Sequence, residues 1–239
     1  MMDFSGMKEL TIGGVKLREL SVDGVKVWQA GRLPAGYTEV EWIETDGASW
    51  IDTGVNASLY PDGIRYALDV YTIRFLSTTS TNYYFGAYDG TTRAGALSYA
   101  YSSGEFWLLV GKGAVVSRKC KFEPIGKRIF IEAFSTSTAD TATLTIDGQA
   151  STRGTTITTA NMPNANVYLG HSSGISTTSS TKPLVGRIYS FTMAKADGTP
   201  IRDFVPAKYR DGTVGMFDLV TNTFFGNAGT GTLTAGGAV

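Results

Sequence analysis

The stretch that most clearly indicates the fold is Ile64-Arg65-Tyr66-Ala67-Leu68-Asp69-Val70-Tyr71-Thr72-Ile73. Tyr66, Leu68 and Val70 alternate with the residues between them, and successive side chains of a β-strand point to opposite faces. This period of two predicts a strand with one face turned toward an apolar core.

Similar segments occur before and after this stretch, and Gly-rich or Asp-Gly turns separate several of them. They are 37–43, 106–110, 115–122, 129–134, 141–146, 167–170, 184–194, 201–205, 214–220 and 223–225. About a dozen strands at short spacing, with almost no helical periodicity after residue 37, predict an all-β protein built as a two-sheet antiparallel sandwich.

The composition agrees with this fold class and argues against nucleic-acid binding. The chain has 239 residues, of which 29 are Gly and 42% are hydrophobic, as expected for a large β domain with many tight turns. Lys plus Arg and Asp plus Glu both number 21, so the net charge is zero and nucleic acid is not an expected partner.

The sequence also bears on the compartment. Cys120 is the single cysteine, so no intramolecular disulfide can form, which favours synthesis in a reducing compartment. The start of the chain, residues 1–6, lacks the basic and apolar regions of a secretory signal. No run approaches the roughly 18 apolar residues of a membrane-spanning helix, so membrane insertion is not expected.

The first 30 residues contain a ten-residue repeat, 9–18 followed by 19–28, with a Gly-Gly or Asp-Gly pair at the centre of each unit. This pattern predicts a hairpin in each unit. The two hairpins are expected to form a small meander whose apolar faces are shared by Ile12, Val15, Leu17, Val22, Val25 and Val27. We therefore expect an N-terminal module at 1–30, a Gly/Pro hinge at 31–36 and a main domain at 33–239.

Several ordered blocks carry a family resemblance. They are 33–37, 40–44, 50–54, 186–191, 202–207, 214–222 and 224–231. In this order they resemble the concanavalin A-like lectin/glucanase superfamily in its laminin-G-like form, as found in bacteriophage or prophage structural proteins and in gut bacterial proteins. The resemblance implies a jelly-roll sandwich that binds sugars or proteins.

The N-terminal repeat more loosely resembles short β modules of phage tail proteins. We therefore expect a non-catalytic virion protein, tail- or capsid-associated, that contacts other virion proteins through residues 1–30. Its main domain would attach to a glycan or another host-surface ligand, and such proteins are commonly homo-oligomers. The alternatives are a purely structural virion protein and a secreted or surface enzyme of the glucanase type.

Catalytic patterns are weak in this sequence. Glucanase-type relatives carry carboxylates as Glu-x-Asp-x-x-Glu, because hydrolysis needs an acid and a nucleophile on opposite sides of the glycosidic bond. Glu44 and Asp46 start this pattern, but Ser49 replaces the third carboxylate. His171 is the single histidine and is expected in a loop or at the rim, and no serine stands out as its partner. We expect no enzymatic activity.

No cofactor is expected, and no metal ligands can be named. Hard cations prefer clustered oxygen ligands, whereas the candidate aspartates are scattered and form no Asp-x-Asp-x-Asp run: Asp52, Asp62, Asp69, Asp89, Asp140 and Asp218. Asp218 is expected to hydrogen-bond neighbouring backbone. The family resemblance nevertheless allows a structural calcium ion.

Aromatic residues provide the candidate ligand surface, because sugars bind through apolar C–H faces and hydroxyl groups. Six residues of segments 82–90, 99–101 and 105–107 form the predicted set: Tyr83, Tyr84, Tyr88, Tyr99, Tyr101 and Trp107. Alternation predicts that Tyr83 and Phe85 share one face and that Tyr99 and Tyr101 share another. The alternative is that these rings are half-buried in the sheets with their hydroxyls in water.

Overall fold

The computed structural model describes residues 10–12, 15–17, 19–22, 25–29, 32–79, 81–111, 114–119, 123–136, 142–151, 161–175 and 181–239. Cys120 and Asp140 lie outside these residues. Within them the regular secondary structure is β-strand, apart from one short 3-10 helix, η1 (Ala57–Leu59). The predicted all-β fold class is confirmed.

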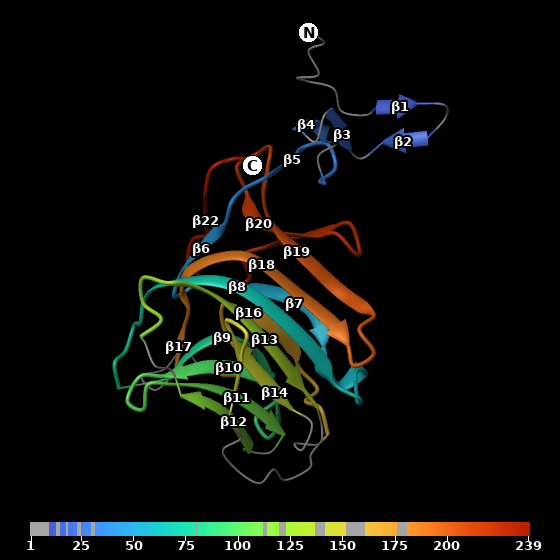
Figure 1. Cartoon of the computed structure of the whole chain (residues 1–239). Coiled ribbons are helices and arrows are strands. Elements are labelled where there is room, and N and C mark those ends of the chain that lie inside the picture. Colours follow the sequence, from blue (N-terminus) through green and yellow to red (C-terminus); the bar gives the residue numbers. More distant parts are fainter. Residues whose placement is uncertain are drawn as a thin grey trace.

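The larger of two main sheets runs in the order β15-β14-β13-β8-β18-β19-β20-β21. Strands β5, β6 and β22 also belong to it, pairing with β19, β18 and β6 respectively. Its strands are β5 (Tyr37–Glu39), β6 (Ile43–Asp46), β8 (Ile64–Arg74), β13 (Arg128–Ser135), β14 (Thr143–Ile146), β15 (Gln149–Ala150), β18 (Val185–Lys195), β19 (Pro200–Tyr209), β20 (Val214–Asp218), β21 (Thr223–Gly226) and β22 (Thr234–Ala235). The two long strands β8 (teal) and β18 (orange) lie side by side at its centre (Figure 1).

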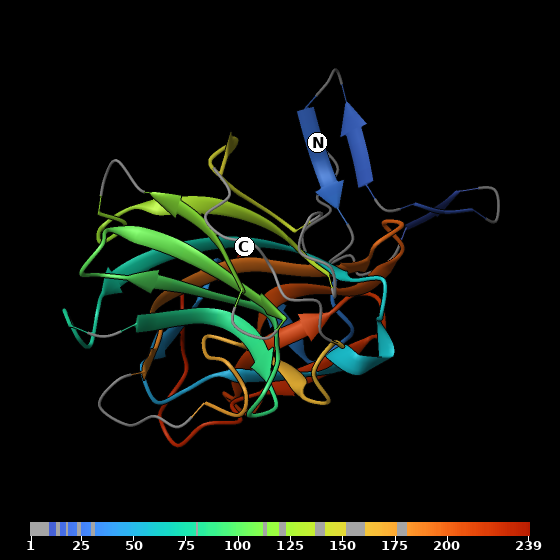
Figure 2. The same cartoon turned by 90° about the horizontal axis from the view of Figure 1, so that it is seen from below.

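The smaller sheet runs in the order β12-β11-β10-β9-β16-β7, and β17 pairs in parallel with β9. Its strands are β7 (Ile51–Asn56), β9 (Thr81–Tyr88), β10 (Arg93–Ala100), β11 (Glu105–Gly111), β12 (Ala114–Lys119), β16 (Asn166–Leu169) and β17 (Thr181–Pro183). Figure 2 shows the green strands β10 and β11 as neighbouring ribbons within this layer. All other pairings between described strands are antiparallel, as predicted.

The core lies between the two sheets. Burial along β8 follows the predicted alternation, because Tyr66, Leu68 and Val70 are buried. Most of the largest fully buried side chains, from both sheets, pack in one cluster that includes Tyr84, Phe85, Phe106, Phe191 and Phe204. Burial of each such apolar side chain stabilises the fold by about 1.5–3 kcal/mol, so this cluster is what holds the two sheets together.

One predicted strand is divided in the structure. Segment 37–43 was expected as a single strand, but β5 ends at Glu39 and β6 begins at Ile43. Val40 makes only an isolated bridge to Ala238, and the chain bends at Glu41. Pairing explains the break, since β5 continues along β19 while β6 pairs with β18 and β22.

The N-terminal repeat forms the two predicted hairpins, β1 (Leu10–Ile12) with β2 (Val15–Leu17) and β3 (Glu19–Val22) with β4 (Val25–Gln29). Their residues pair in register, for example Leu10 with Leu17 and Val22 with Val25. The predicted single meander is wrong, because the two hairpins are separate two-stranded sheets. Among the described residues, no helix has the length and apolar character needed to cross a membrane.

Candidate functional site

Two of the six aromatic residues predicted to bind a ligand belong to the core. Tyr84 is 0% exposed, and its hydroxyl forms a 2.8 Å hydrogen bond with the Thr72 hydroxyl. Tyr99 is 3% exposed and stacks on Phe75 with ring centroids 4.8 Å apart. Neither ring can meet a ligand from solvent, so Tyr84 and Tyr99 do not form part of a ligand surface.

Tyr83 and Trp107 lie on the outer face of the smaller sheet. They pack with Leu109 in a small apolar cluster that is separate from the core, and the Trp107 indole N–H donates to Glu105 at 3.1 Å. The prediction that Tyr83 and Phe85 share a face is wrong. The β9–β10 register shifts between Phe85 and Tyr83, so both Tyr84 and Phe85 turn inward.

The other two predicted aromatics lie apart, since Tyr88 is the last residue of β9 and Tyr101 lies in the turn after β10. The Tyr88 hydroxyl donates to the Gly90 carbonyl at 2.6 Å, and the Arg93 guanidinium lies 4.6 Å from its ring centroid. Tyr101 follows β10, is 36% exposed and does not continue the strand that holds Tyr99. The six residues therefore do not converge on one surface. Tyr83 is only 4% exposed, so its ring is as inaccessible as that of Tyr99, and a ligand role for Tyr88, Tyr101 and Trp107 stays a prediction.

The two carboxylates of the incomplete glucanase pattern, Glu44 and Asp46, make contacts that stabilise the fold. Glu44 forms an ion pair with Arg187 at 2.8 Å on the outer face of the larger sheet. Asp46 accepts hydrogen bonds from the backbone N–H groups of Ala48 and Thr232. Burial alone would raise the pKa of Asp46, but these bonds and one from Ser49 lower it overall. The ionised carboxylate thus holds the C-terminal segment against the turn between β6 and β7.

His171 follows β16 in a loop, as expected, but it is buried rather than at an exposed rim. It is 2% exposed, its Nε2 lies 3.1 Å from the Ile175 carbonyl oxygen, and burial lowers its pKa. Nδ1 has no hydrogen-bond partner in the part of the chain that the structure describes. The contacts given for His171 among the described residues are with the Ile175 carbonyl and the Trp50 ring, 5.2 Å between centroids, whereas a catalytic triad requires a carboxylate and a serine.

The candidate calcium ligands are dispersed. Asp69 pairs with Arg128 at 2.7 Å, and Asp89 accepts from the backbone of Thr91 and Thr92. The described ranges contain no group of three or more His, Cys, Asp or Glu side chains able to hold a metal ion. Structural calcium stays a prediction.

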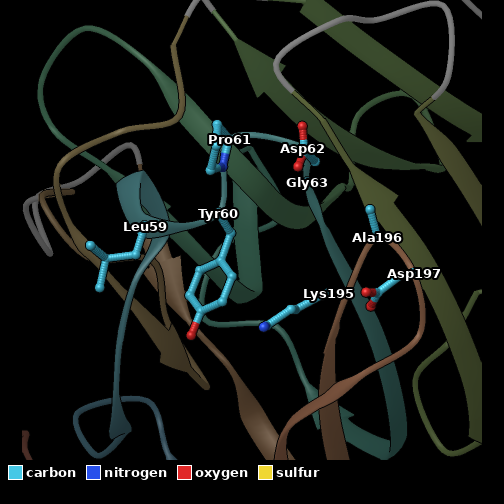
Figure 3. A pocket seen from close by; sticks show the side chains of 8 residues that line it. All are labelled: Leu59, Tyr60, Pro61, Asp62, Gly63, Lys195, Ala196 and Asp197. Atoms are coloured by element: carbon cyan, nitrogen blue, oxygen red, sulfur yellow. The ribbon is translucent and has the colours of Figure 1, made fainter.

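A cavity of about 420 Å³ opens at one end of the sandwich (Figure 3). The connection from β7 to β8 and the turn from β18 to β19 form it together. The lining residues are Leu59, Tyr60, Pro61, Asp62, Gly63, Lys195, Ala196 and Asp197. We call this cavity the end pocket. It falls in the size range of small-molecule sites, which runs from about 300 to 1,000 Å³.

Local hydrogen bonds hold the first wall of the end pocket. The Asn56 side chain caps η1 by accepting from the Ser58 N–H at 3.0 Å, and the Tyr60 N–H closes the turn onto Ala57 at 3.0 Å. Gly63 has φ +114°, and a Cβ there would lie 2.5 Å from the Ser135 carbonyl oxygen. Only glycine fits this position, which presses the wall against β13.

The second wall is the tight turn between β18 and β19. The Thr199 N–H donates to Asp197 at 2.8 Å, and Gly198 adopts φ +90°. Hydrogen bonds from the Thr199 backbone and side chain are the main cause that lowers the pKa of Asp197, and nearby Lys195 adds to it. Asp197 is therefore a permanent anion at neutral pH, suited to accept hydrogen bonds from a ligand.

The end pocket combines an aromatic ring with charged groups of both signs. Tyr60 packs partly against the core, while Asp62, Lys195 and Asp197 come from the two facing turns (Figure 3). None of the six aromatic residues predicted to bind a ligand lies in this pocket. Its signals, Pro61-Asp62-Gly63 and Asp197-Gly198, are ordinary turn patterns that lie far apart in the chain.

The chain consists of two packed sheets with the core between them and a central pair of long strands in the larger sheet. This arrangement is a concanavalin A-like jelly-roll fold. A solved structure from Bacteroides ovatus ATCC 8483, described as a "putative carbohydrate binding protein", is similar to it with a TM-score of 0.55 and 12% identity. The match covers 84% of this chain and 61% of the other, so this chain spans about three fifths of that length.

Two other similar structures have lower TM-scores. Domains LG4-5 of the mouse laminin alpha1 chain match with a TM-score of 0.48 and 14% identity, over 81% of this chain and 50% of that one. A Trypanosoma rangeli sialidase in complex with sialic acid matches with a TM-score of 0.42 and 14% identity, over 72% and 33%. No protein-family model and no curated protein matches the sequence.

Proposed function

We propose that this protein is a non-catalytic carbohydrate-binding protein that holds a sugar in the end pocket. The observation that carries the proposal is an open cavity whose lining includes the Tyr60 ring, two carboxylates and an ammonium group. The shared fold with a structure described as a putative carbohydrate binding protein supports it.

The chemistry of the end pocket matches that of a sugar. An aromatic ring offers an apolar face to sugar C–H groups. The Asp62 and Asp197 carboxyl groups can accept hydrogen bonds from hydroxyl groups, and Lys195 can donate them. Hydrogen bonds to charged groups are the stronger kind, at about 1.5–3 kcal/mol each, and they give orientation as well as affinity.

Removal of the Tyr60 ring tests the proposal. Tyr60→Ala is expected to weaken the binding of neutral glycans about tenfold, as the loss of roughly 1.4 kcal/mol of stacking would. Calorimetric titration with sugars chosen from a glycan array measures this, and Tyr60→Phe should retain most of the affinity. Tyr209→Ala is the matched control, because Tyr209 is also half-buried but lies at the far end of β19, outside the lining of the end pocket. Absence of binding to any glycan, or equal loss in both alanine variants, would contradict the proposal.

The proposal that the protein is not an enzyme has its own test. We expect the purified protein to leave polysaccharides at their original length, since Glu44 and Asp46 are both engaged in structural contacts. Size-exclusion chromatography and a reducing-end assay measure chain length. Depolymerisation that disappears in Glu44→Gln or Asp46→Asn would show a glucanase-type enzyme instead.

We further propose that the protein is displayed on a virion through residues 1–30. The formation of two separate hairpin sheets by this segment is compatible with such a module. In a homo-oligomer, several end pockets would bind together and so raise a weak single-site affinity. Tail or portal genes beside its gene would support this role, and polysaccharide-utilisation genes would oppose it. A purely structural virion role is the alternative if no glycan binds.

A further inference from the structure

A second depression lies on the outer face of the larger sheet, over strands β14, β13, β8 and β18. Its volume is about 320 Å³. The residues that line it are Arg65, Tyr66, Ala67, Glu132, Ala133, Phe134, Thr143, Thr145, Thr192 and Ala194. We call it the face hollow. None of the predicted ligand residues and none of the end-pocket residues lines it.

Strand register explains why the face hollow exists. One cross-strand row places Thr145, Glu132, Ala67 and Thr192 side by side. The next row places Thr143, Phe134, Arg65 and Ala194 side by side. Small side chains at Ala67, Ala194 and the threonines form the floor, while the larger side chains stand above it. Threonine hydroxyls can both donate and accept hydrogen bonds along this floor.

The face hollow and the end pocket share a wall. The shared wall consists of Arg65 and Phe134, and the Arg65 guanidinium lies 4.5 Å from the centroid of the Phe134 ring. Arg65 Nε donates to the Ala196 carbonyl at 2.9 Å, so the residue that lines the hollow is bonded to the turn that lines the pocket. On the other side, Phe134 lies against Gly63, where an added Cβ would be 2.9 Å from the ring.

Charge limits the kind of ligand that could occupy both depressions. The end pocket holds Asp62, Asp197 and Lys195, while the face hollow holds Arg65 and Glu132. The carboxylates outnumber the cations by one, so the combined lining repels rather than attracts an anion. The Glu132 carboxylate has no hydrogen-bond or ion-pair partner within the described ranges, and it remains able to accept from hydroxyl groups. A glycan rich in sulfate or carboxylate would place like charges together.

We propose that the two depressions are successive subsites for one chain of neutral sugars. The end pocket takes one sugar against Tyr60, and the chain passes the Arg65–Phe134 wall so that the following sugars lie over the face hollow. This inference rests on the proposed sugar binding by the end pocket and adds the ligand class, a neutral oligosaccharide rather than a single sugar. Two neighbouring subsites joined by one ligand should raise affinity with chain length.

The experiment compares affinities along a series of neutral oligosaccharides. Wild-type protein is titrated with members from monosaccharide to hexasaccharide, and the gain from the shortest to the longest is expected to be about tenfold or more. Thr192→Leu fills the face hollow and should reduce this gain to about twofold or less, with unchanged monosaccharide affinity. Ser190→Leu is the matched control, a hydroxyl residue of β18 outside the lining. Glu132→Ala is a second variant in case Thr192→Leu does not fold.

The outcomes separate this inference from the proposed function. The two-subsite proposal would be overturned if wild-type affinity did not rise with chain length, or if the rise persisted in both Thr192→Leu and Glu132→Ala. Sugar binding by the end pocket would still stand in either case. Tighter binding of sulfated or uronic acid oligomers than of neutral ones would also overturn it. If no sugar of any length binds, or if binding is indifferent to Tyr60→Ala, the proposed function of the end pocket fails first.

Discussion

Replacing Asp218 with alanine is expected to lower the free energy of unfolding by about 3–5 kcal/mol, the usual cost of removing one partner from a buried charged network. Asp218 ends β20 and is 0% exposed. Its carboxylate accepts hydrogen bonds of 2.5–3.3 Å from the N–H groups of Asp203, Val220 and Thr221, and from the Thr221 hydroxyl.

Loss of these hydrogen bonds would also leave buried polar groups without partners. Asp218 also lies 3.6 Å from Arg202 Nε, whose side chain is only 17% exposed. Alanine at this position would leave a largely buried guanidinium without its carboxylate and several N–H donors without acceptors. Each buried group left unpaired costs about 1–3 kcal/mol, and more when it is charged.

Urea denaturation followed by tryptophan fluorescence measures the effect. Asp211→Ala is the control, because Asp211 also accepts a 2.8 Å bond from a turn N–H, that of Thr213, but is fully exposed. The control should unfold close to the wild-type midpoint. If both variants unfold at the same urea concentration, the buried network does not stabilise the fold as argued.

Much of the sandwich could be predicted because many strands have one face in the core and the other in solvent. Strand β8 shows the pattern most clearly, since burial alternates along nearly its whole length. Strands β13 and β18 were predicted to within a few residues for the same reason. The prediction that Asp218 hydrogen-bonds neighbouring backbone is also confirmed, since its carboxylate accepts from the N–H groups of Val220 and Thr221.

Alternation is lost where both faces of a strand are covered. In β9 and β10 nearly every residue is buried, because the core lies on one face while the cluster with Trp107 and Ile175 covers the other. Their sequences therefore contain no period of two, and the aromatic residues there could be placed on either face. The bulge beside Tyr84 cannot be seen from the pattern at all.

The end pocket was beyond prediction for a different reason. Its walls are two ordinary turns, around Asp62 and Asp197, which meet only because β8 and β18 pair along almost their whole length. The pairing of Ile64 with Lys195 brings the start of one strand to the end of the other. Sequence periodicity identifies strands but not their partners, so sites between distant turns remain hidden.

The core position of Tyr84 leads to the second large effect. Tyr84→Ala is expected to lower the free energy of unfolding by about 3–5 kcal/mol, the range for removing a buried aromatic side chain. Its ring packs 5.4 Å from the Phe106 ring centroid, and its hydroxyl bonds Thr72 across the two sheets. An alanine would open a cavity between the sheets and leave the Thr72 hydroxyl without this partner.

Tyr84→Phe separates the two contributions. The ring is retained, so only the hydrogen bond to Thr72 is lost, and the expected cost falls to about 1–2 kcal/mol. Urea denaturation gives both values, and glycan titration at low temperature, where Tyr84→Ala is still folded, should show unchanged affinity per folded molecule. A Tyr84→Ala variant of wild-type stability that no longer binds glycan would place this ring at a ligand surface. The large stability loss with intact binding is expected instead, because a side chain enclosed by both sheets acts on the fold and not on a ligand outside it.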